Sequence, residues 1–195
     1  MSKFIIGTDG GAYKQNDGTF DSVAAMRIYG DERLMYKEAI LLKGRTNNYA
    51  EIYAIMRGLK AIDSYIRVNK IKNAEVILIT DSELCWKSLT QWIDGWLQNA
   101  SDALLKNSEG KPVVNQEIIK MAYIYYLRLE SKCKIKLCHI NSHCSINNLD
   151  KDLKKFNKKN KMKLNIEEYE LLYAINDECD KMVAECYTGY IISQK

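Results

Sequence analysis

The sequence predicts an α/β fold, in which a mixed β-sheet is flanked by helices. The first reason is the order of the hydrophobic patterns, because three strand-like segments open the chain and later strands alternate with helical segments. The second reason is the kind of connection, since strands joined by a crossover helix pair in parallel and consecutive strands joined by short loops pair antiparallel. With 195 residues, 47% of them hydrophobic, the chain can bury a substantial core as a single domain over residues 1–195.

The first forty residues predict an antiparallel meander of three strands. Residues 3–8 are an apolar run followed by Asp-Gly-Gly at positions 9–11, which predicts a buried strand leading into a turn. Residues 19–29 and 34–42 predict two further strands joined by a short polar connection.

Helical and strand-like patterns alternate after this meander. Apolar residues approximate helical spacing from Asn47 onward, and either Thr46 or Asn47 is suited to cap that helix. Residues 74–80 predict an apolar strand, and the Asp81-Ser82 pair after it is suited to begin a short helix. This strand is expected to pair in parallel with the first.

The second half of the chain predicts one more strand and several helices. Residues 91–111 are the least regular part and predict a protruding helix and loop, and residues 113–129 predict a tyrosine-rich helix. Lysines alternate with apolar residues over 133–140, which is typical of a half-buried strand. A basic helical insertion at about 145–166 and a helix from about 167 to 187 complete the chain.

Charge is segregated along the chain although the net charge is only +4. Residues 148–163 carry a net charge of +5, and residues 167–186 carry −6. The N-terminus does not resemble a signal peptide, no apolar run approaches the roughly 20 residues that cross a bilayer, and the six cysteines lack CxxC spacing. We therefore expect a soluble, cytoplasmic protein with reduced thiols and no membrane partner, and we take a monomer as the starting assumption.

Four carboxylates stand where this fold can bring negative charge together. Asp9 and Asp81 follow strands that can lie parallel and adjacent, so both are expected at the carboxyl ends of those strands, where open α/β sheets place their sites. Glu51 lies one turn into the first helix and Asp180 lies on the last, so both can reach the same place. Any single acid is more often a surface group or part of a turn. A cluster of acids, however, calls for a divalent metal ion to neutralise it.

The succession of these motifs closely resembles the type 1 ribonuclease H family over nearly the whole chain. The motifs that carry the resemblance are Ile6-Gly7-Thr8-Asp9-Gly10-Gly11, Thr46-Asn47-Asn48-Tyr49-Ala50-Glu51, Ile79-Thr80-Asp81-Ser82, a late His143, and Asn176-Asp177-Glu178-Cys179-Asp180. The resemblance implies a ribonuclease H-like fold with a five-stranded mixed sheet, and cleavage of the RNA strand of RNA/DNA hybrids to 5′-phosphate and 3′-hydroxyl products.

The resemblance also implies the roles of individual residues. It makes Asp9, Glu51, Asp81 and Asp180 the ligands of two Mg²⁺ ions, with Mn²⁺ as an alternative, and adds His143 as a catalytic loop histidine. Two such ions about 4 Å apart can activate water and relieve charge on the departing oxygen. The substrate contacts that it implies are Asn47, Asn48, Gly10, Gly11 and Ser82.

Several of these residues have simpler interpretations. His143 can exchange protons near neutral pH, but it can also hydrogen-bond within its loop. Asn47 or Asn48 can cap a helix instead of contacting a 2′-hydroxyl group. A zinc site formed by Cys138, His139, His143 and Cys144 is disfavoured, because Cys138 and His139 point to opposite faces of a strand.

Three features depart from the family pattern. Glu83 adds negative charge after Asp81 and Ser82, and the protruding segment 91–111 has a net charge of −1, which makes it a poor phosphate clamp. The insertion at about 145–166 is rich in lysine. We hypothesise that Lys154, Lys155 and Lys158, together with Lys159, bind the hybrid in place of the protrusion; a solvated helix is the alternative.

The sequence therefore predicts a metal-dependent endonuclease that acts on RNA/DNA hybrids. One alternative is a DNA-processing nuclease of the same fold, which the Thr46-Asn47-Asn48 element and the loop histidine His143 disfavour. The other is a non-catalytic nucleic-acid-binding module, which the presence of all four acids disfavours. The biological role, the preferred metal ion and the oligomeric state do not follow from the sequence.

Overall fold

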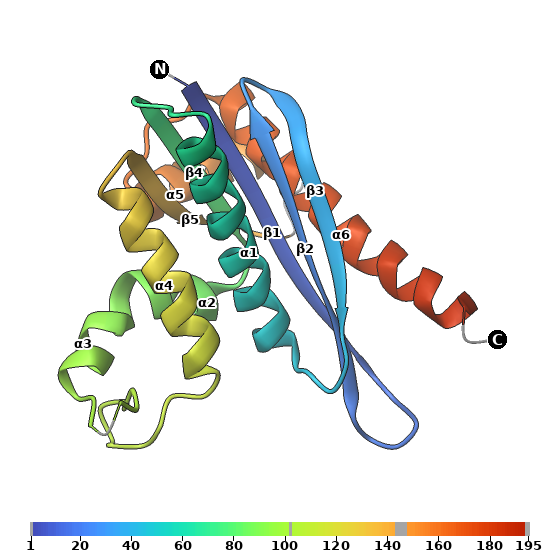
Figure 1. Cartoon of the computed structure of the whole chain (residues 1–195). Helices are drawn as coiled ribbons and strands as arrows, with labels where there is room; N and C mark the ends of the chain where they lie inside the picture. Colours follow the sequence, from blue (N-terminus) through green and yellow to red (C-terminus); the bar gives the residue numbers. More distant parts are fainter. Residues whose placement is uncertain (1, 102, 143–147, 194–195) are drawn as a thin grey trace.

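The computed structural model describes residues 2–101, 103–142 and 148–193, and its centre is a five-stranded mixed sheet (Figure 1). The strands lie in the order β3-β2-β1-β4-β5. They are β1 (Ser2–Lys14), β2 (Phe20–Gly30), β3 (Arg33–Leu42), β4 (Ala74–Thr80) and β5 (Lys134–His139). The first three pair antiparallel, and β4 pairs in parallel with both β1 and β5. The predicted fold class is confirmed.

Helices cover both faces of this sheet (Figure 1). Helices α1 (Asn47–Val68) and α4 (Gln116–Glu130) pack on one face, where Ile6, Leu59 and Leu78 belong to the larger core. Helices α5 (Leu149–Asn160) and α6 (Ile166–Ser193) pack on the other face. Residues of β1 point alternately to the two sides of the sheet, so Ile6 belongs to the core under α1 and α4 while Ile5 belongs to the core under α5 and α6.

The segment between β4 and α4 projects away from the sheet (Figure 1). It begins with α2 (Glu83–Lys87), a single π-helical turn η1 (Ser88–Trp92) and α3 (Ile93–Gln98). In the described residues 99–101 and 103–115 it continues with two isolated β-bridges and no further helix or strand. Helix α4 therefore begins three residues later than predicted. The reason is Asn115, whose left-handed backbone (φ 58°) cannot belong to the helix.

The prediction of a turn at positions 9–11 is wrong. Strand β1 continues to Lys14, which pairs with Phe20, and the turn comes after it, where the Gln15 N–H donates to the Thr19 carbonyl at 2.8 Å. The glycines serve a different purpose, because a Cβ atom on Gly10 would lie 2.5 Å from the Glu51 backbone nitrogen and one on Gly11 would lie 2.5 Å from Val183. They let α1 and α6 approach β1 closely.

Within the residues that the structure describes, no helix has both the length and the hydrophobicity that crossing a membrane requires.

Candidate metal centre

The unequal lengths of β1 and β4 bring Asp9 and Asp81 together. Strand β4 stops at Thr80, opposite Thr8, whereas β1 runs six residues further to Lys14. Asp9 and Asp81 directly follow this last parallel pair, so both lie where β1 loses its β4 neighbour. Glu51 comes from the second turn of α1. This helix can approach β1 closely because Gly10 has no side chain.

Asp9, Glu51 and Asp81 form a compact acid trio. Each offers a carboxylate oxygen, and these oxygens all lie within 4.8 Å of one another. Asp9 is 5% exposed and Glu51 is 4% exposed, while Asp81 is half-buried. Three negative groups so close together and so little hydrated strongly favour either protonation or a bound cation.

The pKa values of Asp9 and Glu51 reflect this crowding of negative charge. Burial, followed by the charge of Asp81, raises the pKa of Asp9 to about 7, and the N–H of Gly10, which donates to Asp9 Oδ1 at 2.8 Å, offsets only part of the shift. Burial and the charges of Asp9 and Asp81 raise the pKa of Glu51 well above its usual value. All charged neighbours that shift these two pKa values are acids.

The trio fits a hard divalent cation. Glu51 Oε2 is buried and has no hydrogen-bond partner, so its lone pairs are available to coordinate a cation. An all-oxygen, carboxylate-rich set suits Mg²⁺ or Mn²⁺ better than softer metals, and Mg²⁺ normally keeps several waters besides a few carboxylates.

Comparison with known proteins identifies the family. A family model for RNase H matches residues 1–164. The chain belongs to the ribonuclease H family. Its relatives include a ribonuclease H of Chromobacterium violaceum, 32% identical over 113 residues, which are 58% of this chain and 66% of the relative. The chain spans about half to two thirds of the length of the first curated relatives that it matches.

Solved structures show the same ribonuclease H fold. A foamy viral protease-reverse transcriptase in complex with RNA/DNA hybrid is similar with a TM-score of 0.57 at 21% identity, over 83% of this chain and 19% of that one. LC11-RNase H1 in complex with RNA/DNA hybrid is similar with a TM-score of 0.50 at 19% identity, over 81% of this chain and 96% of that one.

The fourth predicted acid of this ribonuclease H family member, Asp180, lies outside the trio. It is exposed on α6, beyond the stretch that the family model matches, but its charge contributes to the raised pKa values of Asp9 and Tyr13. Helix α6 is held on β2 by Glu178, which accepts from the Tyr29 hydroxyl at 2.5 Å and pairs with Arg27 at 3.0 Å. Asp180 is thus near the trio without being part of it.

The predicted loop histidine, His143, lies outside the described residues, as does Cys144 of the zinc alternative. Of that alternative, Cys138 and His139 are described and both are buried. Burial raises the pKa of the Cys138 thiol to about 12, which opposes the thiolate form that zinc requires.

The predicted substrate residues surround the trio. Thr46, not Asn47, precedes the helix as its N-cap, although its side chain makes no capping bond. Asn47 and Asn48 are exposed in the first turn of α1, and the Asn47 side chain lowers the pKa of Glu51 by hydrogen bonding. Ser82 has a capping role, since its hydroxyl accepts from the Cys85 N–H at 3.4 Å.

The basic insertion contains α5, whose Lys154, Lys155 and Lys158 are exposed. Lys159 differs from them, because its Nζ atom lies 3.1 Å from Glu83 Oε1 and 3.0 Å from His139 Nδ1. Lys159 and Lys87 lower the pKa of Glu83. The extra negative charge near the site is therefore balanced by the insertion, a pairing that no local sequence signal indicates.

Proposed function

We propose that this chain is a metal-dependent endonuclease that hydrolyses the RNA strand of RNA/DNA hybrids and leaves 5′-phosphate and 3′-hydroxyl ends. The observation that carries the proposal is the acid trio, with its buried, unpartnered Glu51 oxygen and the raised pKa values of Asp9 and Glu51. Family membership supports the reaction class. The two structural neighbours that were solved with RNA/DNA hybrid support the substrate class.

The residues of the site divide the work between them. Asp9, Glu51 and Asp81 would hold the cations, with Asp180 nearby on α6. When bound, two divalent cations supply an activated water and stabilise charge on the scissile phosphate and the leaving 3′ oxygen. Because Asp9 titrates near neutrality, its proton must leave before a cation binds. Gly10 keeps α1 close enough for Glu51 to join Asp9.

Recognition of the hybrid falls to the rim of the site. Asn47 and Asn48 present exposed amides beside Glu51, and amides can both donate to and accept from a 2′-hydroxyl group. Gly10, Gly11 and Ser82 offer backbone and small polar groups next to the acids.

The lysines of α5 provide a phosphate-binding surface at the same edge. The helix is anchored beside Asp81 through Lys159, which binds Glu83 and lies over the Trp86 ring at 4.9 Å. Lys154, Lys155 and Lys158 remain exposed, although Lys155 also pairs with Asp152 at 3.4 Å. Replacing all three by alanine should weaken hybrid binding and flatten its salt dependence, whereas replacing Lys70, Lys72 and Lys134, near the opposite end of the central strands, should leave the salt slope unchanged.

The decisive experiment offers the purified chain four labelled substrates: RNA/DNA hybrid, single-stranded RNA, duplex RNA and duplex DNA. With Mg²⁺ we expect cutting of the RNA strand of the hybrid alone, and no cutting with chelator. Asp9→Asn should lower turnover by at least about 10³-fold, since it removes one of the carboxylates that would hold the cations.

A matched control separates the site from general effects of charge. Asp177 is an acid of α6 that pairs with Lys181 at 2.6 Å, so Asp177→Asn should leave turnover unchanged while Asp180→Asn reduces it. Cutting of duplex DNA instead of hybrid would support the DNA-processing alternative, and hybrid binding without any metal-dependent cutting would support the non-catalytic one.

A further inference from the structure

A row of tyrosines lies along the C-terminal half of α6. Tyr13 of β1 and Tyr187 of α6 stack face to face, with ring centroids 3.5 Å apart and planes 4° from parallel. Tyr190 follows, with its centroid 6.4 Å from that of Tyr187, and Lys43 Nζ lies 5.4 Å from the centroid of Tyr190. We refer to Tyr13, Tyr187, Tyr190 and Lys43 as the tyrosine row.

The tyrosine row lies on the same sides of β1 and α6 as the proposed metal-site residues Asp9 and Asp180. Side chains two residues apart in a strand share a face, so Asp9 and Tyr13 lie on the same side of β1, about 13 Å apart along the strand. That side faces α6, because a Cβ atom on Gly11 would meet Val183 of α6 and lie 3.6 Å from the Tyr13 hydroxyl. On α6, Tyr187 lies two turns beyond Asp180 on the same side, about 10 Å along the axis.

Electrostatics agrees with this placement. After burial, the charges of Asp180 and Asp9 are the largest causes that raise the pKa of Tyr13. The row therefore starts about 10 to 13 Å from the proposed cleavage site, which is roughly three to four nucleotide steps of a duplex strand.

The rings are held in place but not covered. Gln15 Nε2 donates to the Tyr187 hydroxyl and to the Tyr13 carbonyl, both at 3.1 Å, which fixes the stacked pair at the β1–β2 turn. The three tyrosines are half-buried and Lys43 is exposed. Contact with Val183 gives Tyr13 and Tyr187 a packing role as well, but packing does not account for a lysine placed over the outermost ring.

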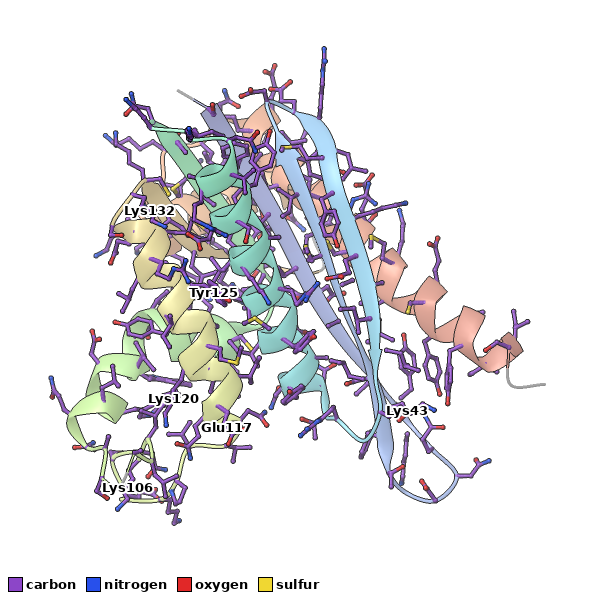
Figure 2. The ribbon with its side chains drawn as sticks, in the orientation of Figure 1. Lys43, Lys106, Glu117, Lys120, Tyr125 and Lys132 are labelled. Carbon is purple, nitrogen blue, oxygen red and sulfur yellow. The ribbon has the colours of Figure 1, made fainter. Side chains whose placement is uncertain are left out.

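The row is also continuous with the proposed substrate rim. Lys43 belongs to the connection between β3 and α1, four residues before Asn47. Figure 2 shows Lys43 at the foot of β3, below the C-terminal part of α6, which Figure 1 shows extending beyond the sheet. A nucleic-acid strand that passes the acid trio and the start of α1 would next reach the rings of the tyrosine row.

We propose that the tyrosine row binds the single-stranded continuation of a nucleic-acid strand as it leaves the metal centre. Bases stack on tyrosine rings with little dependence on their identity, and a lysine beside the rings contacts the phosphates. This combination distinguishes a single strand, whose bases are free to stack, from a duplex, whose bases are not. The inference rests on the proposed function and extends its substrate to hybrids with single-stranded ends.

The test compares a blunt hybrid with the same hybrid extended by single-stranded RNA or DNA at one end, with fluorescence anisotropy as the readout. Binding is measured in the Asp9→Asn background to prevent cutting. An extension on the strand that leaves the metal centre toward the tyrosine row should tighten binding by about tenfold, the effect of roughly one stacked base. Tyr187→Ala and Tyr190→Ala should each reduce this gain to about twofold or less.

Tyr36→Ala is the matched control, because Tyr36 is an exposed tyrosine on the outer strand β3 whose hydroxyl contacts Glu38 instead of the row. It should keep the full gain. Thermal melting checks that each variant folds, and Tyr190→Ala, at the end of the row, keeps the proposal testable if Tyr187→Ala is unstable.

Two results would overturn the proposal. One is an extension that does not tighten binding by the Asp9→Asn protein, and the other is a tightening that both tyrosine variants retain. Neither result affects the proposed function, which depends on metal-dependent cutting of the blunt hybrid by the unsubstituted chain. Failure of that cutting would overturn the proposed function instead.

Discussion

Two acids of the same helix, Glu51 and Asp63 of α1, are buried to a similar extent but in opposite electrostatic surroundings. Asp63 is 2% exposed and pairs with Arg128 and Lys132, each at 2.9 Å. Lys132 lies at the junction of α4 and β5 (Figure 2). Glu51 is 4% exposed, has Asp9 and Asp81 as charged neighbours, and keeps one oxygen without a partner.

The difference shows how a structural acid can be told from a functional one. Burial of a carboxylate costs free energy at both positions, and at Asp63 two cations of the chain compensate for it. At Glu51 the described part of the chain adds the further acids Asp9 and Asp81 instead, which favours a cation bound from solution. Unmatched charge, and not burial, marks the site.

The largest expected effect is on the structural acid. Asp63→Asn should lower the free energy of unfolding by about 2 to 3 kcal/mol, because it removes a doubly paired buried charge. Urea unfolding in chelator measures the loss. The control is Asp177→Asn, which removes an exposed pair and should cost less than about 0.5 kcal/mol. Equal losses for the two variants would contradict the structural role of Asp63.

The close approach of α1 to β1 gives the next effect. Gly10→Ala should cost about 2 kcal/mol, because the new Cβ atom would lie 2.5 Å from the Glu51 backbone, and it should weaken Mg²⁺ binding by moving Glu51 away from Asp9. Gly95→Ala is the control, since a Cβ there meets no atom within 4 Å, and it should be neutral or slightly stabilising. Unchanged Mg²⁺ affinity in Gly10→Ala would contradict the claim that Gly10 positions Glu51 for metal binding.

The smallest effect concerns the metal-free trio itself. A raised pKa means that native Asp9 keeps a proton that the unfolded chain releases, so its contribution to stability falls as pH rises from about 4 through about 7. Asp9→Asn removes this dependence and should raise metal-free stability above pH 7 by about 1 kcal/mol. Urea unfolding with chelator at several pH values measures the difference between the two proteins. A difference that does not vary with pH would contradict the raised pKa.

The fold followed from the sequence because its signals are local and repeated. The apolar run at 74–80 coincides with β4, and the predicted strands at 34–42 and 133–140 lie within one residue of β3 and β5 at each end. Parallel pairing of β1 with β4 then placed Asp9 beside Asp81.

The errors and omissions depend on contacts between distant residues. Asp-Gly-Gly is a turn pattern by local rules, but here the glycines admit helices from 41 and 172 residues along the chain. The pairing of Glu83 with Lys159, 76 residues away, depends on how α5 docks. The stacking of Tyr13 on Tyr187 likewise depends on the path of α6. None of these contacts has a periodic signal in the sequence.

The central claim is that the acid trio holds a divalent cation, and anomalous diffraction from a crystal soaked in Mn²⁺ tests it most directly. We predict an anomalous peak coordinated by carboxylate oxygens of Asp9, Glu51 and Asp81, with Mn–O distances equal to or slightly longer than the roughly 2.1 Å typical of Mg–O. The peak should be lost in Asp9→Asn. A soaked crystal with no anomalous density at the trio, at a pH above 7 where its carboxylates are free to ionise, would contradict the claim.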